Sequence, residues 1–360
     1  MGENMFQKLK YKYTHARASQ KKIWLRNGVG IVLVFLIALA VWFVLSMWAK
    51  SPEVVLSTGA SASAQVRDPL TGLFVDAAHP NQQIYGVMID EHVDARAQSG
   101  IDQAFLVIEA PVEAGIPRLL AFFSEDQKVE KIGPVRSARP YFVDWALEFD
   151  ALYTHVGGSN EALAKIASGP TFDLNEFWHD PQFWRATSRS APHNVYTSTD
   201  RMGEYVKAKR DAGRAAPLYG VWKFKTTEPT EVLPEKFSIR YTSSDYTFSW
   251  AYDVEQKAYV RLFDDQPVKT LEGNKIDAQN VVVMISDVEV IDSIGRRHIR
   301  TTGEGVASVF QDGKKMEAVW KKPAASERLR FYTKEGTEIE MNPGKTWIEV
   351  IADASQLIMQ

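Results

Sequence analysis

The most distinctive hydrophobic pattern of the chain is residues 29–49, which are almost wholly apolar and carry no charge. At about 1.5 Å per residue, a helix of these 21 residues is about 31 Å long, which matches the hydrocarbon core of a bilayer. Trp24 and Trp48 stand at its two edges, where interfacial aromatic residues are common. The pattern predicts one transmembrane helix over residues 28–49.

The charges around this stretch predict its orientation. Residues 1–27 contain seven Lys or Arg residues and one acid, Glu3. Because cationic flanks stay in the cytosol, we expect a cytosolic basic tail, contact with the lipid bilayer through residues 29–49, and a single-pass plasma-membrane protein whose later residues are extracytoplasmic. A cleaved signal peptide is the alternative, but the run exceeds the usual apolar length of about 7–15 residues. Residues 50–67, rich in Ser, Ala, Thr and Gly, predict a flexible linker.

Short apolar runs and helical spacing alternate over residues 68–213. Runs bounded by Gly and Pro predict strands, and the spacing of apolar residues from Phe142 to Phe149 predicts a helix that begins after Pro140. The expected strands are 84–89, 105–108, 118–123 and 151–156, and the expected helices are 141–149, 159–167 and 198–212. This order predicts a mixed α/β domain.

The pattern changes after residues 214–235, a proline-interrupted stretch that we interpret as an inter-domain connection. Residues 236–360 contain only β-type runs, separated by turn sequences such as Asp312-Gly313. The expected strands are 236–240, 247–253, 258–263, 281–290, 298–302, 307–311, 314–320, 329–333 and 346–351. The sequence therefore predicts an α+β fold: one transmembrane helix, an N-terminal mixed α/β domain, and a mainly antiparallel β domain that forms a small barrel or sandwich.

Composition limits the possible chemistry. The chain has no Cys, which excludes disulfides, thiolate catalysis and a lipidated Cys anchor. Beyond the basic tail it carries 35 basic and 44 acidic residues, a net charge of −9. An acidic, extracytoplasmic region repels phosphate backbones, so we expect no nucleic-acid partner.

Seven segments of the sequence resemble those of one known family. They are DPLTGL (68–73), VMID with His92 following (87–92), QSGIDQA (98–104), IGPVRSARPYFVDWALEFDALYTHVGGS (132–159), SRSAPHNVYTST (188–199), TTGEGVASVF (301–310) and NPGKTWIEV (342–350). Together they resemble the YerB-like lipoproteins, an envelope family of unknown function. The resemblance implies an envelope location, an N-terminal mixed domain and a C-terminal β domain, without an established activity. The chain departs from the family in lacking the lipidated Cys, which the predicted transmembrane helix replaces.

A glycine-rich bend follows the fourth expected strand, in the sequence THVGGS. Two glycines let backbone N–H groups turn outward, and Ser159 can cap the following helix. His155, Gly157, Gly158 and Ser159 are therefore candidates for binding an anion at a helix N-terminus. The alternative is a tight turn in which Ser159 serves only as the N-cap.

Two arginines three residues apart lie in the sequence GPVRSARP. The guanidinium groups of Arg136 and Arg139 suit bidentate binding of a carboxylate or phosphate, and the prolines restrict the backbone around them. The alternative is that each arginine pairs with an internal acid such as Glu109, Glu113 or Asp144.

His193 follows a proline in a polar loop and is a candidate for proton transfer or ligand contact, with Asn194 beside it to orient the ring. The alternative is a structural role in the loop. A hydrolase or transferase would use His193 as the base and Glu109, Glu113 or Asp90 as its acidic partner.

Asp90 and His92 lie at the end of the first expected strand, and the period of two places them on the same side. With a glutamate from a neighbouring hairpin they are candidates for holding a divalent cation. No HExxH, EF-hand, P-loop or GxGxxG motif accompanies them. We therefore expect no metal and no cofactor.

Aromatic residues crowd residues 172–184, a segment with little strand or helix pattern. As loop residues they are candidates for stacking on sugar rings, and the alternative is that they fill the interior of their own loop.

These candidates lead to one preferred function and two alternatives. We expect a membrane-anchored envelope protein that binds an anionic cell-wall polymer or envelope component through an Arg/His/Gly-rich cleft. The first alternative is the cell-wall-directed hydrolase or transferase that uses His193. The second is an assembly module that binds another membrane protein through an edge strand.

Overall fold

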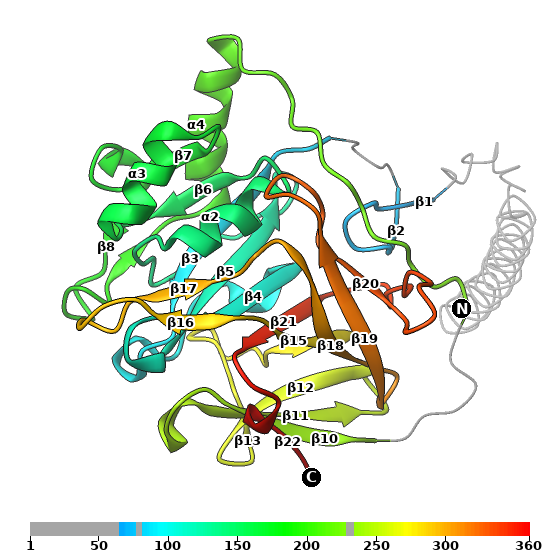
Figure 1. Cartoon of the computed structure of the whole chain (residues 1–360). Helices are drawn as coiled ribbons and strands as arrows, with labels where there is room; N and C mark the ends of the chain where they lie inside the picture. The colour runs from blue at the N-terminus through cyan, green and yellow to red at the C-terminus, as the bar shows by residue number, and fades with distance from the viewer. Residues whose placement is uncertain (1–64, 77–80, 228–233) are drawn as a thin grey trace, which may run out of the picture. The chain divides into compact units, whose positions relative to one another are not determined.

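The computed structural model describes residues 65–76, 81–227 and 234–360 (Figure 1). The expected basic tail, the expected transmembrane helix and nearly all of the expected linker lie outside these residues. Within the described residues, no helix is long and apolar enough to cross a membrane. The last linker residues form β1 (Val66–Arg67), which pairs with β2 (Phe74–Val75) around the DPLTGL turn.

Ten strands from both halves of the chain form one mixed sheet, in the order β20-β19-β18-β15-β21-β4-β5-β3-β6-β7. The first half contributes β3 (Ile84–Asp90), β4 (Leu106–Pro111), β5 (Pro117–Ser124), β6 (Leu152–His155) and β7 (Phe172–Asn175), and the second contributes β15 (Asn280–Ile285), β18 (Gly303–Gln311), β19 (Lys314–Lys322), β20 (Arg330–Tyr332) and β21 (Thr346–Ile351). The halves join where β21 runs parallel to β4, with Glu349 opposite Glu109.

A second sheet of six strands is antiparallel throughout. Its members are β10 (Lys236–Arg240), β11 (Thr247–Asp253), β12 (Ala258–Phe263), β13 (Gln266–Pro267), β14 (Asp277–Ala278) and β22 (Leu357–Met359). The second half is mainly antiparallel, as expected after residue 236. It does not form a separate barrel or sandwich, because five of its strands extend the sheet of the first half. Among them, β21 is parallel to both of its neighbours.

The shorter elements connect these sheets. Two further two-stranded ribbons pair β8 (Trp184–Arg185) with β9 (Val195–Tyr196) and β16 (Val288–Val290) with β17 (Arg297–Ile299). The single-turn helices are η1 (Val93–Ala95), η2 (Ile101–Gln103), η3 (Glu113–Gly115), η4 (Asp180–Gln182), η5 (Ser244–Tyr246) and η6 (Ala354–Gln356).

The three α-helices of the described residues lie where the sequence predicts them. They are α2 (Pro140–Leu147), α3 (Asn160–Ser168) and α4 (Thr199–Asp211). Pro140 occupies the first turn of α2, where its missing N–H has no consequence. The side chains of Ser159 and Ser198 cap α3 and α4 by accepting hydrogen bonds from backbone N–H groups of their first turns.

Apolar side chains cover both faces of the ten-stranded sheet, because alternate residues of each strand point to opposite sides. Phe122 of β5 belongs to the core that includes Trp145 of α2. The next residue, Phe123, belongs to the opposite core with Met202 of α4 and Trp250 of the six-stranded sheet. Helices α2 and α3 therefore cover one face (Figure 1), and α4 and the six-stranded sheet cover the other.

The aromatic segment of residues 172–184 is only partly a loop. Its start forms β7 at the edge of the large sheet, and Phe172 and Phe183 are buried. Phe177 and Trp178 are 61% and 77% exposed, so only these two large aromatic side chains of the segment face solvent to that extent.

Candidate functional site

The carboxylate of Asp90, at the end of β3, is the point where three separate segments meet. Its Oδ2 accepts a hydrogen bond from His193 Nδ1 at 2.7 Å and lies 2.9 Å from Arg136 Nε. Its Oδ1 accepts from the backbone N–H of His92 at 3.1 Å. The Asp90 side chain is only 3% exposed. The structure thus brings together four residues that the sequence analysis named: Asp90, His92, Arg136 and His193.

Backbone contacts fix this meeting point. Arg136 N–H donates to the carbonyl of Met88 on β3 at 2.9 Å, which places the Arg136 side chain beside Asp90. The loop that carries His193 is held by Arg189, whose guanidinium donates to the carbonyls of Ala95 and Ala97. These contacts are long-range in sequence, and they make the site part of the fold.

His92 completes the cluster. Its ring stacks on that of His193, with ring centres 5.0 Å apart and planes 20° apart. Its Nδ1 accepts a hydrogen bond from the backbone N–H of Asp94 at 3.2 Å. Among the described residues, no protein group hydrogen-bonds Nε2 of either ring. Both imidazoles therefore keep one nitrogen available for a proton, a ligand or a metal ion.

A third arginine, Arg118, is buried next to Asp90. It stands opposite Asp90 on the neighbouring strand β5 and is 6% exposed. Its guanidinium donates to the carbonyl of Ser137 at 3.0 Å and forms no ion pair with any described residue. Burial, with the like charge of Arg139, lowers the pKa of Arg118 to about 10. Arg118 was not among the predicted site residues, although a cation inside the apolar run 118–123 is a usable signal.

Arg139 is paired with an acid from a neighbouring loop. It donates to the Glu113 carboxylate from Nε at 2.8 Å and from Nη2 at 2.7 Å. Burial opposes ionisation of Glu113, but the hydrogen bonds from Arg139 prevail and lower its pKa. The ion-pair alternative therefore holds for Arg139 with Glu113, and for Arg136 with Asp90.

A hollow of about 290 Å³ adjoins Arg139. Its lining residues are Glu113, Ser137, Arg139, Gly158, Ser159, Asn160, Ile294 and Arg296. The expected cleft is therefore divided: Arg139, Gly158 and Ser159 share this hollow, whereas Arg136 and His193 belong to the Asp90 cluster. The segment of residues 136–139 links the two regions.

The glycine bend is held by internal hydrogen bonds. Gly157 N–H donates to the Asn175 side chain at 2.9 Å, and Ser159 N–H donates to the carbonyl of Ala138 at 3.3 Å. Ser159 Oγ accepts from Ala162 N–H as the cap of α3 at 3.2 Å. Since these amides already have partners, the bend is the tight turn with an N-cap serine, and the expected set of outward amides is reduced.

Two residues expected to contact a ligand, His155 and Asn194, are engaged in hydrogen bonds within the protein. His155 is fully buried, with Nδ1 2.7 Å from the carbonyl of Gly157 and Nε2 2.7 Å from Asp173 Oδ1. The side-chain amide of Asn194 donates to the carbonyls of Ala186 and Arg189, both at 3.3 Å, and does not orient His193. Neither residue presents a free polar atom to a ligand.

The two expected catalytic glutamates are also engaged elsewhere. Glu109 is fully buried and accepts hydrogen bonds from Arg261 and from the Trp347 indole. Glu113 accepts from Arg139. Neither is therefore the partner of His193, and the carboxylate that His193 does contact is Asp90.

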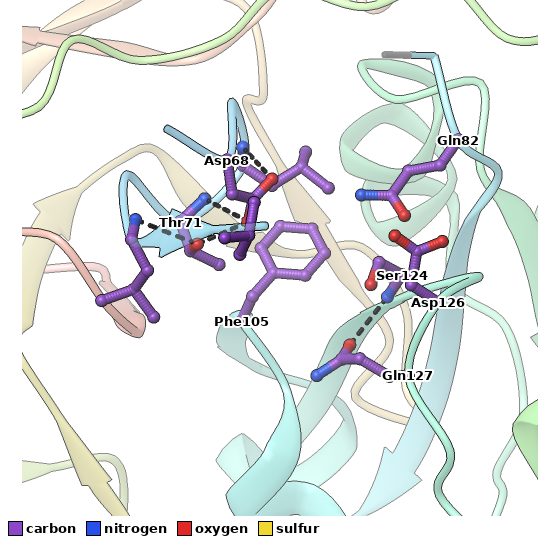
Figure 2. A pocket seen from close by; sticks show the side chains of 10 residues that line it. Asp68, Thr71, Gln82, Phe105, Ser124, Asp126 and Gln127 are labelled. Carbon is purple, nitrogen blue, oxygen red and sulfur yellow. Dashed lines mark hydrogen bonds between the residues drawn. The ribbon is translucent and has the colours of Figure 1, made fainter. Parts of the chain in front are cut away.

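A separate hollow of about 300 Å³ lies between the DPLTGL turn and the end of β5 (Figure 2). Figure 2 shows Phe105 between the two walls, with Asp68 and Thr71 on one side and Gln127 on the other. Asp68 accepts hydrogen bonds from backbone N–H groups of its own turn, including that of Leu70 at 3.2 Å. None of the candidate residues of the sequence analysis lines this hollow.

The fold and the sequence define a protein of a recognised class. The chain belongs to the family described as protein of unknown function DUF3048: residues 70–213 match its N-terminal domain and residues 237–348 match its C-terminal domain.

Among individual proteins, the "Putative lipoprotein YerB" of Bacillus subtilis (strain 168) is 33% identical over 302 residues, which cover 80% of this chain and 87% of that protein. A crystal structure of the YerB protein from Bacillus subtilis superposes with a TM-score of 0.72 at 31% identity, covering 82% of this chain and all of that chain. The resemblance to the YerB-like family is confirmed.

Proposed function

We propose that this chain is an extracytoplasmic envelope protein that binds an anionic envelope component beside its arginine cluster, which consists of Arg118, Arg136 and Arg139. The description of a close relative as a putative lipoprotein supports an envelope location. In this chain the anchor would be the predicted membrane span of residues 29–49, because no Cys is present to carry a lipid.

The observation that carries the proposal is the charge balance of the cluster. Three guanidinium groups face two carboxylates, those of Asp90 and Glu113. Arg118 is the residue left without an acidic partner among the described residues, and it is buried. Asp90 and Glu113 lie near Arg118 but are directly paired with the other two arginines, so a bound anion would offset the remaining positive charge.

The hollow beside Arg139 has donors suited to an anion. Ser159 Oγ accepts a hydrogen bond from the first turn of α3 and keeps its own proton to donate. The N-terminus of α3 adds a favourable dipole. Because the sequence beyond the basic tail carries a net charge of −9, this local positive excess contrasts with the rest of the protein.

The test is retention of the full chain, in detergent micelles, on purified cell-wall sacculi before and after removal of their phosphate-bearing polymers. We expect R136Q/R139Q to bind at least about tenfold more weakly than wild type, because two charge-assisted contacts are lost. The matched control is K207Q/K321Q, which removes two exposed cations elsewhere. Thermal unfolding of each variant shows whether it is folded. Equal retention of the double variant and the control contradicts the proposal.

A second candidate function is proton-transfer chemistry, because His193 has a buried carboxylate on Nδ1 and a free Nε2. This is the arrangement of a general base oriented by an acid. It predicts soluble fragments when sacculi are incubated with the full chain, and their loss in H193Q. If the wild-type protein releases no fragments, the hydrolase function is eliminated while the binding function stands.

A further inference from the structure

We infer that His92, Asp94 and His193 form a binding site for a divalent transition-metal ion, for which Zn²⁺ is the best match. One ligand atom from each of the three residues lies within 4.8 Å of the others. The separation of His92 Nδ1 and Asp94 Oδ2 is 3.4 Å. Two ligands of a tetrahedral zinc ion with bonds of about 2.0–2.1 Å are about 3.3 Å apart, so this pair already has a suitable spacing.

His193 is oriented as a metal ligand by a buried acid. Its Nδ1 is 2.7 Å from Asp90 Oδ2, and a neutral ring that donates there presents the lone pair of Nε2 outward. Ligating histidines in metal sites commonly donate their other nitrogen to a carboxylate in this way. Asp90 is itself held by the His92 N–H and by Arg136, so the support is rigid.

The other two ligands have the freedom to close on an ion. To bind an ion through Nδ1, His92 would give up only the local hydrogen bond that this atom accepts from the Asp94 N–H at 3.2 Å. The Asp94 side chain is 70% exposed, and its carboxylate already lies 3.4 Å from Nδ1 of His92, one of the two stacked rings. Since the three ligand atoms lie within 4.8 Å of one another, a closure of at most roughly 1.5 Å among them brings every separation to zinc spacing.

The donor set determines the kind of ion. Two imidazoles and one carboxylate suit Zn²⁺, whereas Mg²⁺ and Ca²⁺ prefer sites built from oxygen. Three protein ligands leave a fourth position open, as in catalytic rather than structural zinc sites. The inference is independent of anion binding, because it uses none of the three arginines as a ligand.

The competing explanation is that the Asp90–His193 contact serves only to hold the loop of residues 185–194. The two explanations differ at His92 and Asp94, which the loop does not require. The experiment is therefore built on those two residues, since replacement of His193 risks displacing the loop.

The full chain without an affinity tag, stripped with a chelator, is titrated with ZnCl₂ by calorimetry, and with CoCl₂ to record the visible spectrum. We expect one Zn²⁺ bound at this site, with an intense tetrahedral cobalt spectrum. H92Q and D94N should each weaken binding by at least about tenfold while leaving the unfolding temperature unchanged. D90N, which removes the charge of the acid that orients His193 and pairs with Arg136, should weaken it by about 10–100-fold.

The control is H298Q, which removes an exposed histidine on β17 and should leave Zn²⁺ binding at the wild-type value. The absence of a site that H92Q and D94N weaken overturns the inference. So does Zn²⁺ affinity that is equal in wild type and in both variants, because the ion would then bind elsewhere on the chain.

Discussion

Arg261 on β12 donates two hydrogen bonds to the carboxylate of Glu109 on β4, at 2.5 and 3.0 Å, although 152 residues separate them. Both side chains are buried between the two sheets. A second acid, Glu349 on β21, lies 3.6 Å from the same guanidinium and accepts hydrogen bonds from Trp250 and Tyr241. This polar cluster joins the six-stranded sheet to the large sheet, across the junction of the two halves of the chain.

Replacement of Arg261 by Met should destabilise the protein strongly. The change leaves the Glu109 carboxylate buried without the guanidinium that pairs with it, and breaking a buried pair in this way costs about 3–5 kcal/mol. The free energy of unfolding, measured by urea denaturation, should fall by at least this amount. R240M, at an exposed position on β10, is the control and should change it by less than about 0.5 kcal/mol.

A double replacement separates the charge effect from packing. E109L/R261M removes both members of the bidentate pair, so it should recover part of the stability that R261M alone loses. If R261M is as stable as R240M, the cluster does not hold the sheets together.

The same cluster predicts how stability depends on pH. Burial raises the pKa of Glu349 to about 8, and burial also raises the pKa of Glu91, which lies 3.9 Å from Arg261, to about 7. Both folded-state values exceed the ordinary 4.5, so the stability that these protonated groups contribute is complete below pH 4.5 and is lost as pH rises to about 8.

Between pH 5 and pH 8 the free energy of unfolding should therefore fall, because the folded protein holds protons on these two carboxyls that the unfolded chain has already released. Urea denaturation at several pH values measures it. E349Q, which cannot ionise, should show a clearly smaller decrease over the same range. A wild-type stability that is constant or rises from pH 5 to pH 8 is incompatible with this interpretation.

Local features of the sequence predicted many of the helices and strands. The pairing between strands that are distant in the sequence could not be predicted in this way. The starts of α3 and α4 follow from capping serines, and β10, β11 and β12 have the predicted bounds, because alternation and turn residues act over a few positions. The parallel pairing of β21 with β4 joins residues more than 200 apart and has no local signal. Local patterns therefore located most of the longer strands, but they gave no indication that strands of the two halves pair in one sheet.

The candidate site shows the same division. Asp90, His92, Arg136 and His193 were chosen for their chemistry, and the fold does bring them together. Asp90 was one of three acids considered as the partner of His193, but the sequence could not select it. The other two, Glu109 and Glu113, are paired with arginines whose positions depend on tertiary packing. Residue type indicates what a side chain can do, whereas burial and pairing decide whether it is available.

Gly157 provides a test of the glycine bend. Its φ of +56° is in the left-handed region, and an added Cβ would lie 2.8 Å from the Phe177 ring. G157A should lower the free energy of unfolding by about 1–2 kcal/mol, mainly through backbone strain, because the exposed Phe177 ring can move aside. G213A, at a φ of +96° with open space around it, is the control for strain without contact.

The double variant G157A/F177A distinguishes the two causes. If backbone strain dominates, the loss caused by G157A should be nearly the same in the F177A background. Full recovery of stability in that background would show that the contact with the Phe177 ring, and not the left-handed backbone, requires glycine.

His155 separates a structural histidine from a ligand-binding one. H155A leaves the carbonyl of Gly157 and the carboxylate of Asp173 without their contacts and opens a cavity, so it should cost about 2–4 kcal/mol. D173N retains an acceptor opposite Nε2 and should cost less than about 1 kcal/mol. H298A, at an exposed position, should leave stability unchanged.

The decisive measurement is retention on sacculi, expressed per folded molecule. Because His155 has no exposed surface, folded H155A should be retained as well as wild type at a temperature well below its unfolding transition. Loss of retention by folded H155A, with no change for H298A, would instead place His155 in contact with the ligand and would require the bend to open on binding.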